Sequence, residues 1–272
     1  KHILEFENNP NLKSNIKMLD IQYRMPRQIG NLISRFFYNS KLKNPDTSLL
    51  PTFDKDKFHE LKFKKPMASI FDTIEEKEIE VPNSIVFVST SKQENPSDNN
   101  NVFDRRNNCN KNVIKDILTQ LNNLYPNNLK REKPLTIGII AGYRGQVNLL
   151  QDIKLEQFNN FVITNEDGRP EPLIEINTVD KFQGAERDII IYDIVRSSKG
   201  SSPIGFLIDY RRINVAFSRV KKLLIVVGDS EYILKRATIF PNKKFKEFKL
   251  QEIVAELDRQ GVIVHNLNEM IE

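Results

Sequence analysis

Two arginines spaced seven residues apart, Arg212 and Arg219, have side chains and a spacing suited to binding phosphate. Residues seven apart lie on the same face of a helix, and the planar guanidinium fork matches phosphate oxygens. An apolar stripe runs beside these arginines and is made of Ile213, Ala216, Phe217 and Val220. The pattern therefore predicts a helix that directs two cations at a fixed anion, and the alternative is a pair of surface salt bridges.

A second group of polar residues, 178–186, follows an apolar run that is typical of a buried strand. It combines the hydroxyl of Thr178, the amide of Gln183 and the carboxylates of Asp180 and Glu186, with Gly184 among them. A loop that only reversed the chain would not need such a range of donors and acceptors. We therefore expect a ligand-binding loop, and the alternative is a polar turn with capping side chains.

Two further segments combine an aromatic ring with a cation. Residues 142–146, Gly-Tyr-Arg-Gly-Gln, follow a strand-like run and open a helical pattern, and the N–H groups at a helix start can bind an anion. Arg144 and Gln146 offer additional contacts. Tyr23, a stacking surface, stands beside Arg24 just before another helical pattern. Each segment alone is also compatible with a tight turn or a packed helix start.

The elements that would position these residues follow from hydrophobic patterning. Apolar, β-branched runs predict buried strands, and apolar residues at helical spacing predict helices. We expect strands at 85–89, 136–141, 174–179, 189–195 and 223–227, and helices at 27–38, 112–124, 145–153, 210–220 and 248–260. Alternation of the two implies a mostly parallel sheet flanked by helices on both faces, with ligands beyond the carboxyl ends of the strands. We expect residues 1–272 to form one α/β domain, with irregular insertions at 41–80 and 91–106.

Composition excludes several classes of protein. The chain has 41 basic and 36 acidic residues, a net charge of +5, and the positive charge is concentrated in residues 1–65 and 205–249, which favours a phosphate-rich partner. One cysteine, Cys109, and three histidines exclude a disulfide scaffold and argue against a metal centre. No apolar run approaches the roughly 20 residues of a membrane helix. We expect an intracellular protein without a membrane partner.

Taken in order, these segments resemble motifs of the second motor domain of superfamily 1 helicases, in the group that contains senataxin and the nonsense-mediated-decay helicase. The matching stretches are Leu-Asp-Ile-Gln-Tyr-Arg-Met-Pro at 19–26, Ile-Gly-Ile-Ile-Ala-Gly-Tyr-Arg-Gly-Gln at 137–146, the stretch 175–188, Val-Arg-Ser at 195–197, and 205–207 with 211–221. The chain departs from the family where Pro26 directly follows Met25 without the usual histidine, and where Ala141-Gly142 replaces Thr-Pro. Neither departure removes a charged catalytic group.

The resemblance implies a RecA-like domain, the second of two that enclose ATP. Arg24 and Arg219 would be arginine fingers that reach the γ-phosphate. Tyr23 would pack near the base and Glu186 would hydrogen-bond the ribose. The remaining residues expected at the nucleotide are Gln183, Gly184 and Arg212. The residues expected to contact the backbone of single-stranded RNA or DNA are Tyr143, Arg144, Gln146 and Thr178.

ATP hydrolysis also requires a Gly-rich phosphate loop that ends in Lys and Ser or Thr, and an acid that holds Mg²⁺. The motif G-x-x-x-x-G-K-[ST] does not occur in the 272 residues. We expect a first RecA-like motor domain of the same polypeptide to precede Lys1 and to bind most of the ATP and Mg²⁺. The chain alone is therefore predicted to have no significant ATPase activity.

Two other functions compete with a motor. A non-catalytic nucleic-acid-binding module derived from a helicase would have no need for Arg24, Glu186 and Arg219, which argues against it. A metal-dependent nuclease would require the fold to gather four carboxylates: Asp180, Glu186, Asp188 and Asp193.

Overall fold

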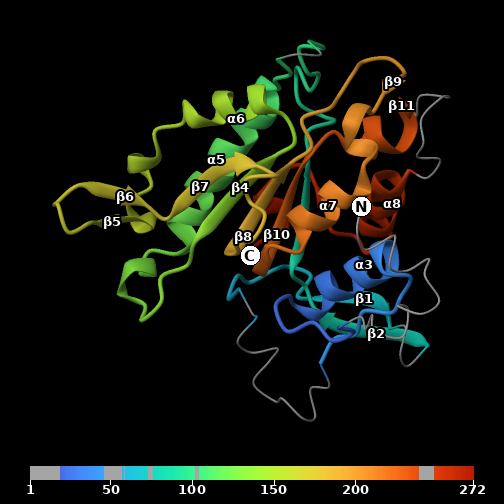
Figure 1. Cartoon of the computed structure of the whole chain (residues 1–272), viewed down its shortest axis with the longest axis horizontal. Helices are drawn as coiled ribbons and strands as arrows, with labels where there is room; N and C mark the ends of the chain where they lie inside the picture. The colour runs from blue at the N-terminus through green and yellow to red at the C-terminus, as the bar shows by residue number, and fades with distance from the viewer. Residues whose placement is uncertain (1–18, 46–56, 58, 73–75, 102–103, 239–247) are drawn as a thin grey trace, which may run out of the picture.

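The computed structural model describes residues 19–45, 57, 59–72, 76–101, 104–238 and 248–272 (Figure 1). Within these ranges the central element is a six-stranded sheet in the order β12-β3-β10-β8-β4-β7, and every neighbouring pair is parallel. Its strands are β3 (Ile85–Ser89), β4 (Ile137–Ala141), β7 (Ile174–Thr178), β8 (Arg187–Asp193), β10 (Val220–Gly228) and β12 (Ile263–Val264). All residues of β3 and β4 are buried, as expected for parallel strands that are covered on both faces.

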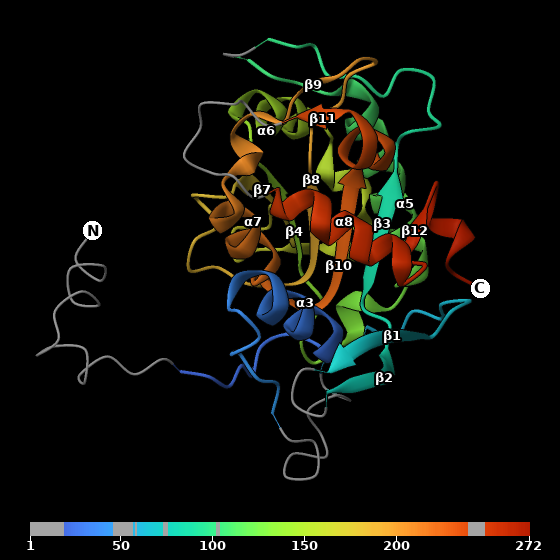
Figure 2. The ribbon, with the colours of Figure 1, turned by 90° about the vertical axis from the view of Figure 1, so that its right-hand side faces the viewer.

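Helices cover both faces of this sheet (Figures 1 and 2). One face carries α5 (Asn108–Leu124) and α6 (Arg144–Gln151), and the opposite face carries α7 (Tyr210–Phe217) and α8 (Lys249–Arg259). The helix α3 (Arg27–Phe37) packs against α7 and α8. In α5 the buried apolar residues are Ile114, Ile117, Leu118 and Leu121, which form one stripe of a helix. The α/β, RecA-like architecture that the sequence predicts is confirmed.

Smaller elements surround the sheet within the described residues. Two antiparallel pairs are β1 (Met67–Asp72) with β2 (Lys77–Pro82) and β5 (Val162–Thr164) with β6 (Pro170–Pro172), and a short parallel pair joins β9 (Ser202–Pro203) to β11 (Ala237–Thr238). Single helical turns are η1 (Asn128–Lys130), η2 (Leu155–Gln157), η3 (Asn159–Phe161), η4 (Gly205–Ile208), η5 (Tyr232–Arg236) and η6 (Leu267–Glu269).

The ends of the expected elements shift for local reasons. The helix α5 begins four residues earlier than predicted, because the side chain of Asn107 caps it by accepting a hydrogen bond from the N–H of Asn110 at 3.0 Å. The helix α7 ends at Phe217, since Val220 already belongs to β10. The expected irregular insertion 41–80 contains β1 and part of β2, and its residues 46–56, 58 and 73–75 lie outside the described residues.

Strand register defines two edges of the sheet. At the carboxyl edge, Thr178 of β7 lies beside Ala141 of β4, which lies beside Asp193 of β8. At the amino edge, Arg187 of β8 pairs with Val220 of β10. The segments that follow β4 and β7 therefore meet at the carboxyl edge, whereas the residues that precede β8 and β10 meet at the amino edge.

Candidate functional site

Four charged residues gather at the amino edge of the sheet, and we call Arg24, Glu186, Arg219 and Lys221 the amino-edge cluster. Nε of Arg24 donates to Oε2 of Glu186 at 2.7 Å, and Nη1 of Arg24 donates to the carbonyl oxygen of Ser218 at 3.1 Å. Nζ of Lys221 lies 3.6 Å from Oε1 of Glu186. The cluster lies at the opposite end of the sheet from the carboxyl edge, because Glu186 directly precedes β8, Arg219 directly precedes β10 and Lys221 is the second residue of β10.

The turn before α3 holds Arg24 in place. Oε1 of Gln22 accepts hydrogen bonds from the N–H of Arg24 at 3.0 Å and of Met25 at 2.8 Å, and Nε2 of Gln22 donates to the carbonyl oxygen of Met25 at 2.9 Å. Pro26 then occupies the N-cap position of α3 without a capping side-chain hydrogen bond, and its missing N–H costs no helical hydrogen bond there. The buried Gln22 side chain thus closes a tight turn that directs Arg24 away from the helix.

Arg219 is fixed where α7 passes into β10. Its Nε donates to the carbonyl oxygen of Val215 at 3.1 Å and its Nη2 donates to Oγ of Ser218 at 3.3 Å. Its carbonyl oxygen accepts from the N–H of Arg187, the first residue of β8, at 3.0 Å. The end of α7 is therefore attached to the residue that follows Glu186.

Electrostatics favour an anion at this cluster, because three cations share one carboxylate. The hydrogen bond from Arg24, with a further contribution from Lys221, lowers the pKa of Glu186. Burial lowers the pKa of Arg219, and the positive charge of Arg24 lowers it further. Two guanidinium groups that oppose each other's charge at a half-buried site are stabilised when a phosphate-like anion binds between them.

A groove of about 550 Å³ opens beside the cluster. Its lining residues include Tyr23, Arg24, Glu186 and Lys221. The ring of Tyr23 is 57% exposed, so it presents an accessible flat surface next to the cations. Four of the residues expected to face the nucleotide, Tyr23, Arg24, Glu186 and Arg219, therefore lie near one another.

We call residues 179–186, which join β7 to β8, the crossing segment. Gln183 and Gly184, which are also expected at the nucleotide, lie on this segment, and Arg212 lies on α7. Gln183 and Gly184 are exposed, and Gly184 has φ +92°, a conformation that favours glycine. Nη2 of Arg212 lies 3.2 Å from Oδ2 of Asp180. Arg212 therefore ties α7 to the crossing segment. Because α7 ends at Phe217, Arg219 lies beyond the helix, and a target shared by Arg212 and Arg219 stays a prediction.

The crossing segment runs from the carboxyl edge back to the amino edge over the face of the sheet. It leaves β7 at Thr178 and enters β8 at Arg187. Phe182 anchors it, because this ring is fully buried and lies where a side chain at Gly138 of β4 would have to be. One short segment therefore touches both edges of the sheet.

At the carboxyl edge, the expected nucleic-acid contacts differ in accessibility. Arg144, the first residue of α6, is exposed, and Thr178 at the end of β7 is partly exposed. Tyr143 is partly covered: the guanidinium of Arg105 lies 5.6 Å from its ring centre, and its hydroxyl packs against Gly205. Burial raises the pKa of Tyr143 to about 12, so its hydroxyl remains a hydrogen-bond donor at neutral pH.

Gln146 is placed differently from the expectation. Its side chain is fully buried, with 0% exposure. Nε2 donates to Oδ2 of Asp193 at 2.7 Å, and Oε1 accepts from the N–H of Asn107 at 2.7 Å. With both ends of its amide engaged inside the protein, Gln146 cannot contact a nucleic-acid backbone in this structure, and it holds the first turn of α6 instead.

The four carboxylates of the nuclease hypothesis do not form a metal site. Asp180 pairs with Arg212, Glu186 belongs to the amino-edge cluster, Asp188 accepts from the N–H and Oγ1 of Thr136 at 3.0 and 2.8 Å, and Asp193 is buried at the other end of β8. No group of three or more His, Cys, Asp or Glu side chains suited to a metal ion occurs among the described residues.

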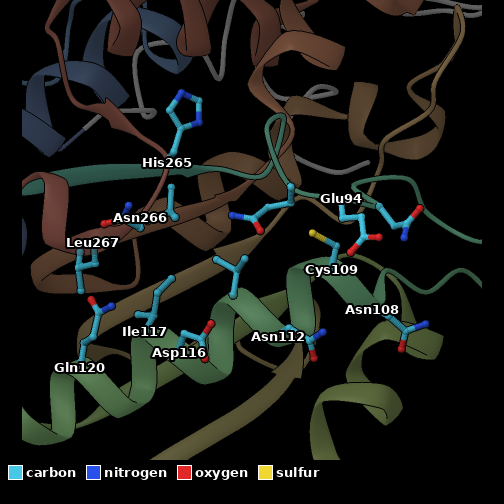
Figure 3. Close-up of a pocket in the computed structure, with 14 residues that line it drawn as sticks. Glu94, Asn108, Cys109, Asn112, Asp116, Ile117, Gln120, His265, Asn266 and Leu267 are labelled. Carbon is cyan, nitrogen blue, oxygen red and sulfur yellow. The ribbon is translucent and has the colours of Figure 1, made fainter.

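Sequence reasoning missed two features. Lys221 joins the amino-edge cluster, and its spacing of two from Arg219 at the start of a strand was the available signal. A polar cavity of about 440 Å³ lies between α5, the loop after β3 and residues 265–267 (Figure 3). Among the described residues, no Lys or Arg lines this cavity, so it is not suited to a phosphate.

No helix within the described ranges is both long enough and apolar enough to cross a membrane.

Comparisons with known proteins show which families and proteins this chain resembles. The family described as "AAA domain" matches residues 4–231. The chain is 33% identical over 219 residues to the "Regulator of nonsense transcripts 1 homolog" of Drosophila melanogaster, covering 80% of this chain and 16% of that protein. It is 26% identical over 231 residues to "Helicase sen1" of Schizosaccharomyces pombe, covering 81% and 11%. A shorter match, 37% over 95 residues, covers 35% of this chain and 8% of the human "DNA replication ATP-dependent helicase/nuclease DNA2".

The chain spans only a small part of each of these relatives. Among solved structures, the C-terminal domain of a possible DNA helicase from Lactobacillus plantarum WCFS1 matches with a TM-score of 0.36 and 13% identity, over 76% of this chain and 88% of that one. The family match covers most of the 272 residues. The chain therefore belongs to this AAA-domain family, the C-terminal RecA-like domains of senataxin- and Upf1-like superfamily 1 helicases.

Proposed function

We propose that this chain is the second motor domain of an ATP-dependent helicase that moves along single-stranded RNA or DNA. One observation carries the proposal: Arg24 and Arg219 converge at the amino-edge cluster, where Arg24 bonds a carboxylate 162 residues away in sequence. Arg24 lines an open groove, and the charge of Arg24 acts on the half-buried Arg219. Such a pair of guanidinium groups is suited to the developing charge of a transferred phosphoryl group.

The residues present fit a nucleotide shared with a first motor domain. Arg24 and Arg219 would contact the γ-phosphate, and Tyr23 would offer its exposed ring to the base. Glu186 would accept a hydrogen bond from the ribose once Arg24 turns toward phosphate, while Lys221 keeps the pKa of that carboxylate low. Mg²⁺ would be held by the first domain. ATP supplies the phosphoryl group, and the arginines of this chain stabilise its charge, an effect typically worth roughly 10³–10⁵ in rate.

The carboxyl edge would hold the strand. Arg144 would bind backbone phosphates, and Tyr143 and Thr178 would add contacts of low sequence preference, as in other single-strand grooves. The crossing segment starts directly after Thr178 and ends at Glu186. It carries Gln183 and Gly184, and Arg212 is attached to it through Asp180. We infer that it transmits the state of the nucleotide to the strand.

The test is strand-stimulated ATP turnover by the full-length protein that contains this chain. Arg219→Ala should lower kcat by about a hundredfold or more at saturating ATP, with nucleotide still bound. The matched control is Arg211→Ala in the same helix, because Arg211 is exposed and pairs with its neighbour Asp209, and its kcat should stay within about twofold of wild type.

Unchanged turnover in Arg219→Ala would overturn the arginine-finger role. If the wild-type protein binds strand but never hydrolyses ATP, the chain is a binding module derived from a helicase.

A further inference from the structure

A buried carboxylate at the carboxyl edge organises the elements around the proposed strand site. Asp193, the last residue of β8, is 0% exposed. It accepts hydrogen bonds from Nδ2 of Asn110 in α5 at 2.7 Å, from Nε2 of Gln146 in α6 at 2.7 Å, and from the N–H of Val195 at 2.8 Å. Three separate segments therefore meet on one side chain.

The donors around Asp193 match an ionised carboxylate. Gln146 must present its NH₂ group, because its Oε1 already accepts from the N–H of Asn107 at 2.7 Å. Asn110 presents its NH₂ group as well, since its Oδ1 accepts from Oγ1 of Thr90 at 3.3 Å. Among the described residues no ion pair neutralises Asp193, so neutral donors alone hold its charge. A protonated carboxyl group would point its O–H hydrogen toward N–H groups, which cannot accept it.

Val195 is held in an unusual conformation by the same network. This β-branched residue has φ +65°, a region that such residues rarely adopt. Its N–H donates to Asp193, and its carbonyl oxygen accepts from Nδ2 of Asn107 at 2.9 Å. The bend leads the chain into Arg196, which is buried and bonded to Asp98 at 2.9 Å. Strained residues persist where surrounding contacts determine them, and here Asp193 supplies one of those contacts.

The network lies next to the residues proposed to hold the strand. Gln146 is two residues from Arg144 in the first turn of α6, and Ala141, which leads into Tyr143, sits directly beside Asp193 in the sheet. Arg105, which covers the ring of Tyr143, is two residues from Asn107. Loss of the Asp193 contacts would therefore release the surroundings of both Arg144 and Tyr143 at once.

We propose that Asp193 is the positioning residue of the strand site, and that its ionised carboxylate sets the orientation of the first turn of α6. This proposal rests on the proposed function, because it assigns Asp193 to the strand-holding edge. Asp193 touches neither strand nor nucleotide, and it acts through Gln146 and Val195.

The charged state of Asp193 gives this role a pH signature. Burial raises the pKa of Asp193 to about 6, against the opposing effect of Asn110, Gln146 and the N–H of Val195. The titratable groups that interact with it are Cys109 of α5 and Tyr192 of β8. Burial raises the pKa of both, that of Cys109 to about 11, so both stay neutral. Asp229, which follows β10, acts with Asp193 on Cys109.

The experiment measures the affinity of the full-length protein for a fluorescent single-stranded oligonucleotide from about pH 5 to pH 8, a range chosen to bracket the expected titration. Wild-type affinity should fall by about tenfold as Asp193 becomes protonated below pH 6, a pH that follows from its pKa. Asp193→Asn should be about tenfold weaker at neutral pH and should lack this step. In ATP turnover the concentration of strand needed for half-maximal rate should rise, while kcat at saturating strand stays within about twofold.

Two variants keep the result interpretable. Asp188→Asn is the matched control, because Asp188 is a hydrogen-bonded carboxylate of the same strand that accepts two hydrogen bonds from Thr136, just before β4, but lies at the amino end of β8. This variant should follow the wild-type profile. Gln146→Leu removes one donor to the carboxylate and should move the step to higher pH. If Asp193→Asn does not fold, this shift of the pH step in Gln146→Leu tests the positioning role of Asp193.

Three outcomes separate the claims. Absence of strand binding by the wild type at every pH would overturn the proposed function. Normal binding by the wild type with the same affinity and pH profile in Asp193→Asn would overturn the positioning role alone. If Asp193→Asn does not fold, a step that Gln146→Leu leaves unmoved would also overturn that role.

Discussion

At the scale of single residues, Glu186 is the group that offsets the positive charge of the amino-edge cluster when no anion is bound. Its carboxylate neutralises part of the charge of Arg24 and Lys221 and so permits three cations to stand together. The same contact occupies Nε of Arg24, the group proposed to reach phosphate. Glu186 and an anion therefore compete for Arg24.

Glu186→Gln tests this competition. Removal of the carboxylate raises the positive charge of the cluster, so the chain should bind inorganic pyrophosphate about threefold to tenfold more tightly. Titration calorimetry at low ionic strength measures this. Glu60→Gln is the matched control, because Glu60 also pairs with an arginine, Arg131, away from the cluster, and its affinity for pyrophosphate should not change. Weaker pyrophosphate binding in Glu186→Gln would contradict the competition.

A buried histidine predicts a pH dependence of stability. Nδ1 of His59 accepts from the N–H of Leu61 at 3.0 Å, so Nε2 carries the hydrogen that is donated to the carbonyl oxygen of Asn83 at 2.7 Å. Burial lowers the pKa of His59 to about 4. Between this value and the ordinary value of 6.5 the unfolded chain binds the proton and the folded chain does not. The free energy of unfolding should therefore fall as pH drops through this window, by about 2 kcal/mol between pH 6.5 and pH 5.

Urea unfolding at several pH values measures this dependence, and His59→Gln should flatten it.

Asp193 has the opposite effect on the pH dependence of stability. Its pKa in the folded chain is raised to about 6 from 3.8, so the folded chain binds the proton first and gains stability as pH falls between these values. Asp193→Asn should therefore steepen the loss of stability on acidification. An unchanged slope in His59→Gln would show that this histidine is not the titrating group.

At the scale of elements, the crossing segment depends on one close approach. A Cβ atom at Gly138 would lie 2.8 Å from the ring of Phe182 and 2.8 Å from Cδ1 of Ile190. Gly138→Ala should therefore lower the free energy of unfolding by about 1–3 kcal/mol, and it should displace Phe182 outward. Urea unfolding monitors the first effect. Gly200→Ala is the control, since nothing lies within 4 Å of its added Cβ, and it should change stability by less than about 0.5 kcal/mol.

Most elements could be predicted from the sequence, because their apolar residues repeat with the period of a helix or a strand. The start of α5 could not, since Asn107 lies in an Asn-rich run where any of several residues can cap a helix. The insertion 91–106 looked irregular, yet its Asp98 is buried between Arg105 and Arg196. Arg105 lies only seven residues from Asp98, but Arg196 is 98 residues away, and no local pattern reveals that these three side chains meet.

The candidate site, like the fold, could be predicted from the sequence only in part. The resemblance to superfamily 1 helicases implied that Arg24, Glu186 and Arg219 face one nucleotide, and in the structure Arg24 is bonded to Glu186 and its charge acts on Arg219. The pattern did not reveal which edge of the sheet they occupy. That depends on the path of residues 179–186 across the sheet, a property of topology. Gln146 was misassigned because the direction in which a side chain points at a helix start depends on what packs beneath it, here Asp193.

At the scale of the whole molecule, the proposed function makes this chain half of a catalytic site. The amino-edge cluster supplies cations and an exposed ring, but the 272 residues contain no G-x-x-x-x-G-K-[ST] motif, and the described residues hold no metal-binding group of carboxylates. Two arginines can stabilise a phosphoryl group only when another surface holds the rest of the nucleotide. Closure of two domains over ATP is the arrangement that satisfies both needs.

This arrangement predicts that the chain alone turns over ATP no faster than buffer, with or without single-stranded RNA, whereas the full-length protein is active. Steady-state phosphate release measures both. In the full-length protein, Arg24→Ala and Arg219→Ala should each lower kcat, and the double variant should lose less than the product of the two single losses, because both arginines stabilise the same charge. Strict multiplication of the losses would mean that they act on separate steps. Turnover by the chain alone that disappears in the double variant would mean that the 272 residues form a complete ATPase site, and the half-site proposal would then be wrong.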